Sequence, residues 1–410
     1  MNKLITNCRS CGSPDLTQFL DLGEQYISDF REDDSRPNKY PLRAVYCEEC
    51  CLVQLDFNTP QPEMYHENYG FKSGISNSIR DDLDDIVTHA FQYKNDPKRW
   101  LDIASNDGTL LSFIPSDVFR VGVDPVGFLC KQATQYADRI VNEFFDCKWF
   151  DGPNGYMKFD VITSISCFYD MPDPNKFVED VKKVLKYNGV WIIQQNYLLS
   201  TIQLDAVDNF CHEHLEYYTL KSLEFLLENH GLEVIDVSVS DVNGGSIRTV
   251  VAQKDAFPIG LSVTKQRNIE TTHGLDNIKA YTKFASRVFT EVEKLKTLVN
   301  DANTLNKSVC ILAASTRGAT IWQAAGFGPN TITYAVERNP AKVGKYFSAI
   351  DVPIVSEDFF HEFPTDYAIV GPWFYSSEIM GREKEYTGEF ILPLPKAIIV
   401  DKTRKYEEDE

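Results

Sequence analysis

Short apolar runs separated by helix-length spacers constrain the fold of this chain more than any other feature of its sequence. Between residues 100 and 254 they lie at 100–105, 119–124, 159–166, 189–196, 232–239 and 246–254. Strands that alternate with helices indicate βαβ units and a doubly wound parallel sheet. The last two runs are close together in the sequence, so we expect this sheet to end in an antiparallel hairpin.

A second, smaller α/β unit is expected in the C-terminal part of the chain. A stretch from about residue 275 to 302 has apolar residues at the spacing of one buried helix face. Strand-like runs follow at 308–315, 331–337, 366–373 and 396–401. Because 410 residues are too many for one ordinary core, we predict an α/β protein with domains at 1–70, 71–257 and 258–410.

Paired cysteines mark the N-terminal segment. Five of the ten cysteines lie within the first 51 residues, in the sequences CRSCG and CEECC. Each C-x-x-C places two thiolates on one tight turn, and two such turns complete a closed tetrahedral zinc site. The expected ligands are Cys8, Cys11, Cys47 and Cys50, with Cys51 as an alternative to Cys50; buried free cysteines are the competing interpretation. Four protein ligands leave no open position, so we expect a structural zinc ion.

The charge balance limits the classes of partner. Lys and Arg total 41 against 60 Asp and Glu, a formal net charge of −19. This charge repels polyanions and disfavours nucleic acid as a partner, although a local Arg or Lys pocket can still bind a phosphate-bearing small molecule. No run approaches the roughly 20 apolar residues of a membrane span, and the N-terminus lacks the apolar core of a secretory signal. We expect a soluble cytoplasmic protein with no membrane partner, and a monomer, because no coiled-coil seam is present.

The first strand-like run leads into a turn of small residues. The sequence LDIASNDGTLL places Ala104–Gly108 between a strand and a helix that begins near Thr109. Such a turn brings a ligand close to the backbone and to a helix N-terminus, which suits a nucleotide or adenosyl group. The next run ends at Asp124, about 20 residues later, where a carboxylate can accept hydrogen bonds from both ribose hydroxyls. The loop lacks the dinucleotide and triphosphate motifs; ordinary β-turns remain the alternative.

Residues 211–219, CHEHLEYYT, contain two of the seven histidines. A zinc site is disfavoured, because the spacing differs from H-E-x-x-H and no third ligand is nearby. A packing role is more plausible for one histidine than for both, because an apolar site would have to satisfy two imidazoles and a carboxylate together. Proton transfer is the favoured interpretation, since histidine titrates near neutral pH and an adjacent carboxylate raises its basicity.

The turn and the following acid resemble the S-adenosylmethionine site of class I methyltransferases. There, an acidic, glycine-containing loop holds the methionyl end of the cofactor and an acid after the second strand holds the ribose. Ala104 stands where many members have glycine; alanine keeps the close approach if its φ is negative. The resemblance implies S-adenosylmethionine as the cofactor and a site made of Asp102, Ala104, Asn106, Asp107, Gly108, Asp124, Pro125 and Ser166.

The chain as a whole resembles the nucleotide-sugar C-methyltransferases, such as the tetronitrose C-3 methyltransferases. The resemblance rests on the paired cysteines, CHEHLEYYT, NGGSIRT at 243–249 and YGFKSGIS at 69–76, and on C-terminal segments at 313–327, 337–347, 352–359 and 371–380. It implies a zinc-binding domain, a class I methyltransferase core and a C-terminal Rossmann-like domain. Cys211 and Asp170 stand where many members have tyrosine and histidine.

The resemblance also implies a reaction. A carbon becomes nucleophilic when a neighbouring ketone acidifies its proton, as at C3 or C5 of a 4-keto sugar; C3 is preferred. We expect His214 to remove that proton and Glu213 and Asn196 to steady the enol or enolate, with no catalytic metal. The substrate would be a deoxysugar on a dTDP, GDP or CDP carrier, contacted by Tyr69, Arg248, Arg317, Lys342 and Lys345.

Two other functions fit the same sequence. An O- or N-methyltransferase with the same fold would not need a substrate with an acidic α-proton. A non-catalytic binding protein could use its zinc turns to recognise a partner. The lysines proposed to bind substrate could instead be ordinary surface cations. The segment 243–248, which contains Arg248, could be a simple hairpin turn.

Overall fold

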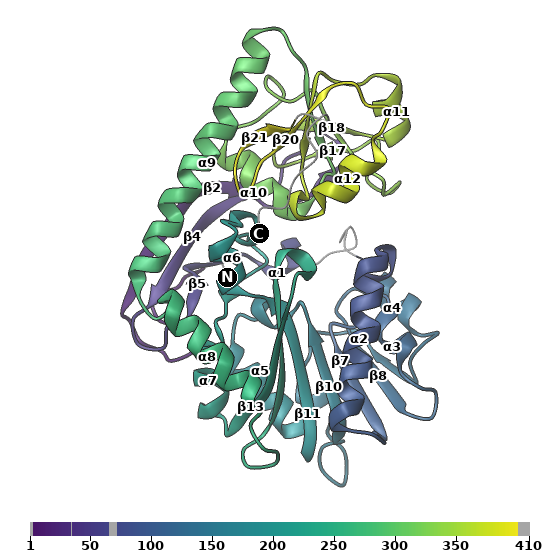
Figure 1. Cartoon of the computed structure of the whole chain (residues 1–410). Helices are drawn as coiled ribbons and strands as arrows, with labels where there is room; N and C mark the ends of the chain where they lie inside the picture. The colour runs from purple at the N-terminus through teal and green to yellow at the C-terminus, as the bar shows by residue number, and fades with distance from the viewer. Residues whose placement is uncertain (1–2, 34, 65–71, 401–410) are drawn as a thin grey trace. The chain divides into compact units, whose positions relative to one another are not determined.

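The computed structural model describes residues 3–33, 35–64 and 72–400 (Figure 1). The chain divides into two compact units that interleave along the sequence. The first takes Met1–Thr17, Val45–Ser200 and Glu213–Ala280, and the second takes Gln18–Ala44, Thr201–His212 and Tyr281–Glu410. The domain boundaries at 70/71 and 257/258 stay predictions, because these units follow contacts rather than sequence position.

In the described part of the first unit, a central sheet has the order β13-β14-β11-β10-β7-β8-β9. The strands are β7 Arg99–Ile103, β8 Phe119–Val123, β9 Arg139–Val141, β10 Phe159–Ile165, β11 Leu185–Asn196, β13 Leu232–Ser240 and β14 Ser246–Gln253. Strands β7 to β11 are parallel, whereas β14 is antiparallel to β11 and β13. The doubly wound sheet and its closing hairpin are confirmed.

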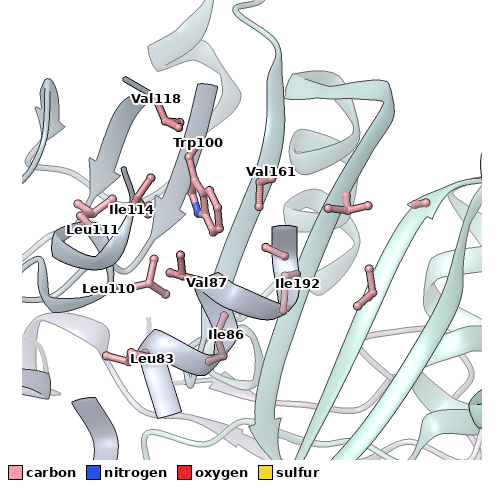
Figure 2. Close-up of a cluster of buried hydrophobic side chains, with 14 of the residues drawn as sticks. Leu83, Ile86, Val87, Trp100, Leu110, Leu111, Ile114, Val118, Val161 and Ile192 are labelled. Atoms are coloured by element: carbon pink, nitrogen blue, oxygen red, sulfur yellow. The ribbon is translucent and has the colours of Figure 1, made fainter. Parts of the chain in front are cut away.

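The described part of the first unit also contains helices, several of which bury one apolar face. They are α1 Gln61–Met64, α2 Asn77–Tyr93, α3 Thr109–Phe113, α4 Gly127–Ala133, α5 Pro174–Val184, α7 Leu220–Asn229 and α8 Leu261–His273. In α2, Leu83, Ile86 and Val87 are buried at helical spacing in the same hydrophobic cluster as Trp100 of β7 and Ile192 of β11 (Figure 2). This cluster fixes α2 on the strands that carry the cofactor loop.

Short strands complete the first unit. β1 Lys3–Leu4 pairs with β6 Phe57–Asn58, and β5 Val53–Leu55 pairs with β12 Glu216–Tyr217, both antiparallel. Three further elements, β2 Leu16–Tyr26, β4 Lys39–Cys47 and α6 Leu198–Gln203, lie where the chain passes from one unit to the other. The β5–β12 pair joins the cysteine-rich segment to the residues that follow His214.

The second unit contains its own α/β sheet, in the order β21-β20-β19-β15-β16-β18-β17-β3. The strands are β3 Phe30–Arg31, β15 Val309–Leu312, β16 Tyr334–Val336, β17 Tyr346–Phe347, β18 Val352–Val355, β19 Tyr367–Val370, β20 Glu389–Leu392 and β21 Ile398–Val400. The accompanying helices are α10 Thr316–Ala324, α11 Glu357–Glu362 and α12 Ser376–Arg382. The expected second α/β unit is therefore present.

The long helix α9, Ile278–Thr304, agrees with the stretch predicted at 275–302. Tyr281, Phe284, Val288, Val292 and Leu295 are buried along one face, at intervals of three and four residues. None of the helices in the described residues is both long enough and apolar enough to cross a membrane.

Candidate active site

The four predicted zinc ligands lie together in the first unit. The sulfur atoms of Cys8, Cys11, Cys47 and Cys50 are all within 4.8 Å of one another, and the Cys8–Cys50 and Cys11–Cys47 sulfur pairs are each 3.5 Å apart. A tetrahedral zinc ion with Zn–S bonds of about 2.3 Å has S–S edges of about 3.8 Å, so this set fits zinc. Cys51 is buried outside the cluster.

The cofactor loop has an unusual backbone. Ala104, Asn106 and Gly108 have φ values of 59°, 51° and 82°, in the left-handed region. The condition set for Ala104, a negative φ, is therefore not met. The turn holds this conformation because Ser105 N donates to Val123 O at 3.1 Å and Gly108 N donates to Ser105 O at 2.9 Å. Backbone strain of this kind gathers where ligands bind.

Asp124 connects the loop to the second strand of the site. Its buried carboxylate accepts hydrogen bonds from Asn106 N at 2.9 Å and Val126 N at 2.8 Å. Burial raises the pKa of Asp124, against the effect of these two backbone donors. Each carboxylate oxygen has a second lone pair, which leaves acceptor capacity for ribose hydroxyls.

Asp102 lies inside β7 and is buried. Thr163 Oγ1 of the neighbouring strand donates to Asp102 Oδ1 at 2.7 Å. Burial raises the pKa of Asp102 to about 7, because the charged form is poorly solvated there. Together with Ala104 and Ser166 it lines a small cavity of about 40 Å³.

A larger cavity of about 300 Å³ opens beside the loop. Its lining includes five of the predicted cofactor residues: Ala104, Asn106, Asp124, Pro125 and Ser166. Asp107 and Gly108 lie in the same turn but outside that lining; Asp107 Oδ2 accepts from Gly74 N at 3.0 Å. The structure thus brings the predicted cofactor residues into one region at the carboxyl ends of β7, β8 and β10.

The two histidines of the His-Glu-His stretch occupy different environments. His212 is buried in the second unit, where its Nε2 lies 3.1 Å from the carbonyl oxygen of Tyr40. Burial lowers the pKa of His212 to about 4, so its imidazole is neutral near pH 7. His212 is a packing residue, and neither histidine belongs to a metal-ligand cluster of the described residues.

His214 belongs to the first unit and is half-buried. Its ring lies against the ring of Tyr169, with centroids 4.3 Å apart and planes inclined by 56°. The backbone beside it is fixed, because Leu215 N donates to Tyr169 O at 2.9 Å. Tyr169 lies in the 3-10 turn Phe168–Asp170, and Asp170 lines the larger cavity, so His214 lies next to a turn that borders the cofactor region.

The other two proposed catalytic residues also lie in the first unit. Glu213 is half-buried and precedes His214. Asn196 is the last residue of β11, opposite Ser246 of β14, and its side chain is half-buried. Because β11 is parallel to β10, Asn196 lies at the same edge of the sheet as Ser166.

The cations proposed to bind substrate have partners within their own units. In the first unit, Arg248 donates from Nε to Gln194 Oε1 at 2.7 Å and from Nη1 to Asp85 Oδ2 at 2.7 Å, and it also pairs with Asp82 at 3.1 Å. Its role toward a substrate stays a prediction. Tyr69 lies outside the described residues.

Arg317, Lys342 and Lys345 all belong to the second unit. Arg317 Nη2 lies 2.8 Å from Asp208 Oδ2, and the guanidinium carbon lies 4.7 Å from the ring centroid of Phe374. Lys342 Nζ donates to Ala314 O at 3.0 Å, and Lys345 Nζ lies 3.4 Å from a carboxylate oxygen of Glu32. Their role as diphosphate ligands stays a prediction.

Comparison with known proteins gives consistent matches along the chain. Family models described as "Putative zinc binding domain", "Methyltransferase domain" and "C-methyltransferase C-terminal domain" match residues 8–65, 77–237 and 241–395. The C-methyltransferase NovU of Streptomyces niveus is 26% identical over 410 residues, covering 97% of each chain. These matches support an S-adenosylmethionine-dependent C-methyltransferase. A tRNA U34 carboxymethyltransferase of Campylobacter jejuni subsp. doylei is 29% identical over 104 residues, 25% of this C-methyltransferase and 33% of that protein.

Solved structures resemble part of the C-methyltransferase. An S-adenosylmethionine-dependent methyltransferase from Clostridium acetobutylicum ATCC 824 matches with 16% identity and a TM-score of 0.34, covering 43% of this chain and 92% of that one. The plantazolicin methyltransferase BpumL matches with 14% identity and a TM-score of 0.35, covering 44% and 87%.

The C-methyltransferase has a class I fold, uses S-adenosylmethionine and carries a zinc-binding domain with four cysteines. The residues present fit the cofactor, since a cavity, a left-handed loop and a buried acid with spare acceptor capacity meet at one sheet edge. We expect the loop to hold the methionyl end of the cofactor and Asp124 its ribose. When bound, the cofactor supplies an electrophilic sulfonium methyl group.

Sequence reasoning missed several residues around the cavity. Glu143, Phe144 and Phe145 line it just after β9, a strand too short to be recognised from its apolar residues. Their position follows from topology, because β9 pairs with β8, which ends at Asp124. Ser73 and Gly74 were also missed; their backbone N–H groups donate to the side chains of Asn106 and Asp107 at 3.0 Å each.

Proposed function

We propose that this C-methyltransferase adds a methyl group to a carbon next to the ketone of a nucleotide-linked 4-keto-deoxysugar, at C3, with His214 as the base. The observation that supports this most is the contrast between the two histidines. His212 is buried with a lowered pKa, whereas His214 is half-buried against Tyr169, beside the turn that borders the cofactor cavity. A catalytic base must take a proton from the substrate and release it to solvent, and the half-buried side chain of His214 is accessible enough for both.

The chemistry follows from the carbon nucleophile. His214 takes the α-proton, and the electron pair of that C–H bond moves into the enolate. Asn196 can donate through its amide to the developing oxyanion, and Glu213 can accept a hydrogen bond from an enol hydroxyl. When held by the loop and Asp124, S-adenosylmethionine would supply the sulfonium methyl group that this carbon accepts, and the electron pair of the broken S–CH₃ bond would stay on sulfur.

The nucleotide carrier needs cations for its diphosphate. Arg317, at the N-terminus of α10, is the first candidate, followed by Lys342 and Lys345. Tyr69 and Arg248 are proposed to contact the sugar. Carboxylates already pair with all three cations, so a bound diphosphate would compete with Asp208, Glu337 and Glu32.

The test is mass spectrometry of the purified protein with S-adenosylmethionine and 4-keto-6-deoxy sugars on dTDP, GDP and CDP carriers. A product heavier by one methyl group, with the methyl on carbon, supports the proposal and names the carrier. A methyl on oxygen or nitrogen, or no product from any of these sugars, contradicts it. Exchange of the sugar α-proton for solvent deuterium without S-adenosylmethionine reports proton removal separately.

The role of His214 is tested in the same assay with a matched control. His214→Gln should abolish both deuterium exchange and turnover while S-adenosylmethionine affinity stays unchanged, because His214 is not among the residues that line the cofactor cavity. His273→Gln, an exposed position on α8, should leave every readout unchanged. Loss of cofactor binding in His214→Gln would show that the residue supports the fold instead.

A further inference from the structure

Arg9 lies in the first zinc turn, between Cys8 and Cys11, yet its side chain points into the first unit and is only 3% exposed. Nη1 donates to Leu55 O at 2.6 Å and to Gln54 Oε1 at 3.1 Å, both in β5. A residue of a surface zinc turn would normally keep its charge in water. This guanidinium instead donates hydrogen bonds inside the protein.

The buried guanidinium reaches the segment that follows His214. Arg9 Nη1 lies 3.5 Å from Leu215 O, and Arg9 Nε lies 3.7 Å from Glu216 Oε1. The Glu216 side chain is fully buried, and no donor of the described residues makes a hydrogen bond to its carboxylate. Arg9 is therefore the cation that faces this buried acid.

Leu215 is held from two sides by backbone groups. Its N–H donates to Tyr169 O at 2.9 Å, and its carbonyl oxygen accepts from Leu55 N at 2.9 Å. Arg9 binds the same Leu55 through its carbonyl oxygen. A shift of Arg9 would therefore move β5, and with it the peptide that carries His214.

The zinc turn is also fixed to the methyltransferase sheet from its other side. The side-chain amide of Asn175, in the first turn of α5, donates to Arg9 O at 2.7 Å and to Ser10 O at 2.9 Å. Residues 171–173, which precede α5, line the cofactor cavity. The zinc turn thus contacts both the segment after His214 and the helix that follows the cavity.

We propose that Arg9 and Glu216 are positioning residues that transmit the geometry of the zinc turn to His214. This inference rests on the proposed function, in which His214 is the base. A buried ion pair contributes little to stability compared with apolar residues of similar size, so stability alone does not explain it. A role in orientation explains the pair, because it fixes the peptide next to the proposed base. Proton transfer depends steeply on the position of the base.

The test is the double variant Arg9→Met/Glu216→Leu, which removes both charges and leaves neither one buried alone. We expect a lower melting temperature, because Leu55 O and Gln54 Oε1 lose a donor, and an unchanged S-adenosylmethionine affinity. The kcat should fall by about 10²-fold, as for a misplaced catalytic group. In protein that carries labelled histidine, the NMR signal of His214 is the one that is absent from His214→Gln. We expect the pH titration curve of this signal to shift in the double variant.

A matched control uses another ion pair of the same unit. Arg267 and Glu224, on α8 and α7, are joined at 2.7 Å and lie in other elements than His214. Arg267→Met/Glu224→Leu should leave the His214 titration and kcat unchanged. If the first double variant fails to fold, Arg9→Lys serves instead, because it keeps the charge opposite Glu216 but loses the forked contacts to Leu55 and Gln54.

The outcomes separate this inference from the proposed function. A folded double variant, or a folded Arg9→Lys, with the wild-type His214 titration would overturn the positioning role, whatever the substrate is. Absence of product from the wild type on every sugar would contradict the proposed function, while the NMR readout would still decide whether Arg9 positions His214.

Discussion

His212 and His214 are two residues apart, yet their side chains lie in different environments. The difference arises from burial: His212 is enclosed and hydrogen-bonded to a backbone carbonyl, and His214 is half-buried against an aromatic ring. The sequence favoured proton transfer for the stretch and allowed a packing role for one of the histidines. Burial assigns that packing role to His212, and proton transfer by His214 stays a proposal.

The lowered pKa of His212 makes stability depend on pH. Its pKa is about 4 in the folded state against 6.5 when exposed. Between these values the unfolded chain binds a proton that the folded chain excludes, so the free energy of unfolding rises with pH. His212→Asn keeps a donor for Tyr40 O without titrating. Relative to this variant, the wild type should lose up to about 3 kcal/mol as pH falls through that window, measured by urea unfolding. If the free energies of unfolding of the wild type and of His212→Asn changed equally with pH, the lowered pKa of His212 would be contradicted.

The left-handed conformation of Ala104 is a second residue-scale feature. An alanine at φ 59° is strained by about 1–2 kcal/mol, whereas glycine adopts this conformation freely. We expect Ala104→Gly to raise the free energy of unfolding by about 1 kcal/mol. Ala285→Gly, inside α9, should lower it by about the same amount. If Ala104→Gly were less stable than the wild type, the contacts of the Ala104 methyl group would stabilise the fold by more than the backbone strain costs.

At the scale of elements, the apolar runs predicted the strands of the seven-stranded sheet except β9, four strands of the second sheet, and the long helix α9. β2 and β4 were missed although they have 11 and 9 residues, because polar residues interrupt their apolar ones. The short strands β9, β18 and β20 were also missed. α8 was missed because few of its residues are buried. Within the site, the cofactor loop could be recognised because it is a local motif. Ser73, Gly74 and Phe144 could not, because topology brings them to the loop from distant segments.

Packing between α3 and α4 explains why the cofactor loop ends in glycine. Gly108 has φ 82°, and a Cβ there would lie 2.8 Å from the backbone Cα of Ala133 in α4. Gly108→Ala should therefore cost at least about 2 kcal/mol of unfolding free energy and weaken S-adenosylmethionine binding. Urea unfolding and calorimetric titration measure the two effects. Gly152→Ala, whose Cβ would meet only Gly155 O at 3.7 Å, should change neither. Equal behaviour of the two variants would contradict this account of the loop.

At the scale of the whole molecule, the cysteine turns are not a separate body within the described chain. Residues up to Thr17 and from Val45 to Ser200 belong to the same compact unit as the seven-stranded sheet. The reason is visible in the contacts: β5 pairs with β12, and Asn175 of α5 binds the backbone of the first zinc turn. Loss of zinc should therefore destabilise the methyltransferase sheet as well as the turns.

Metal content tests this and also decides between the two cysteine pairings that the sequence leaves open. Cys50→Ser should lose the zinc ion and lower the melting temperature, because the sulfur of Cys50 lies in the cluster, 3.5 Å from that of Cys8. Cys51→Ser should keep one zinc ion per chain, since Cys51 is buried outside the cluster. Elemental analysis and thermal melting measure both. The reverse result, with zinc retained in Cys50→Ser and lost in Cys51→Ser, would assign the second turn to Cys47 and Cys51. If Cys50→Ser lost zinc but melted as the wild type does, the turns would be independent of the sheet, and the coupling inferred through Arg9 would have no structural basis.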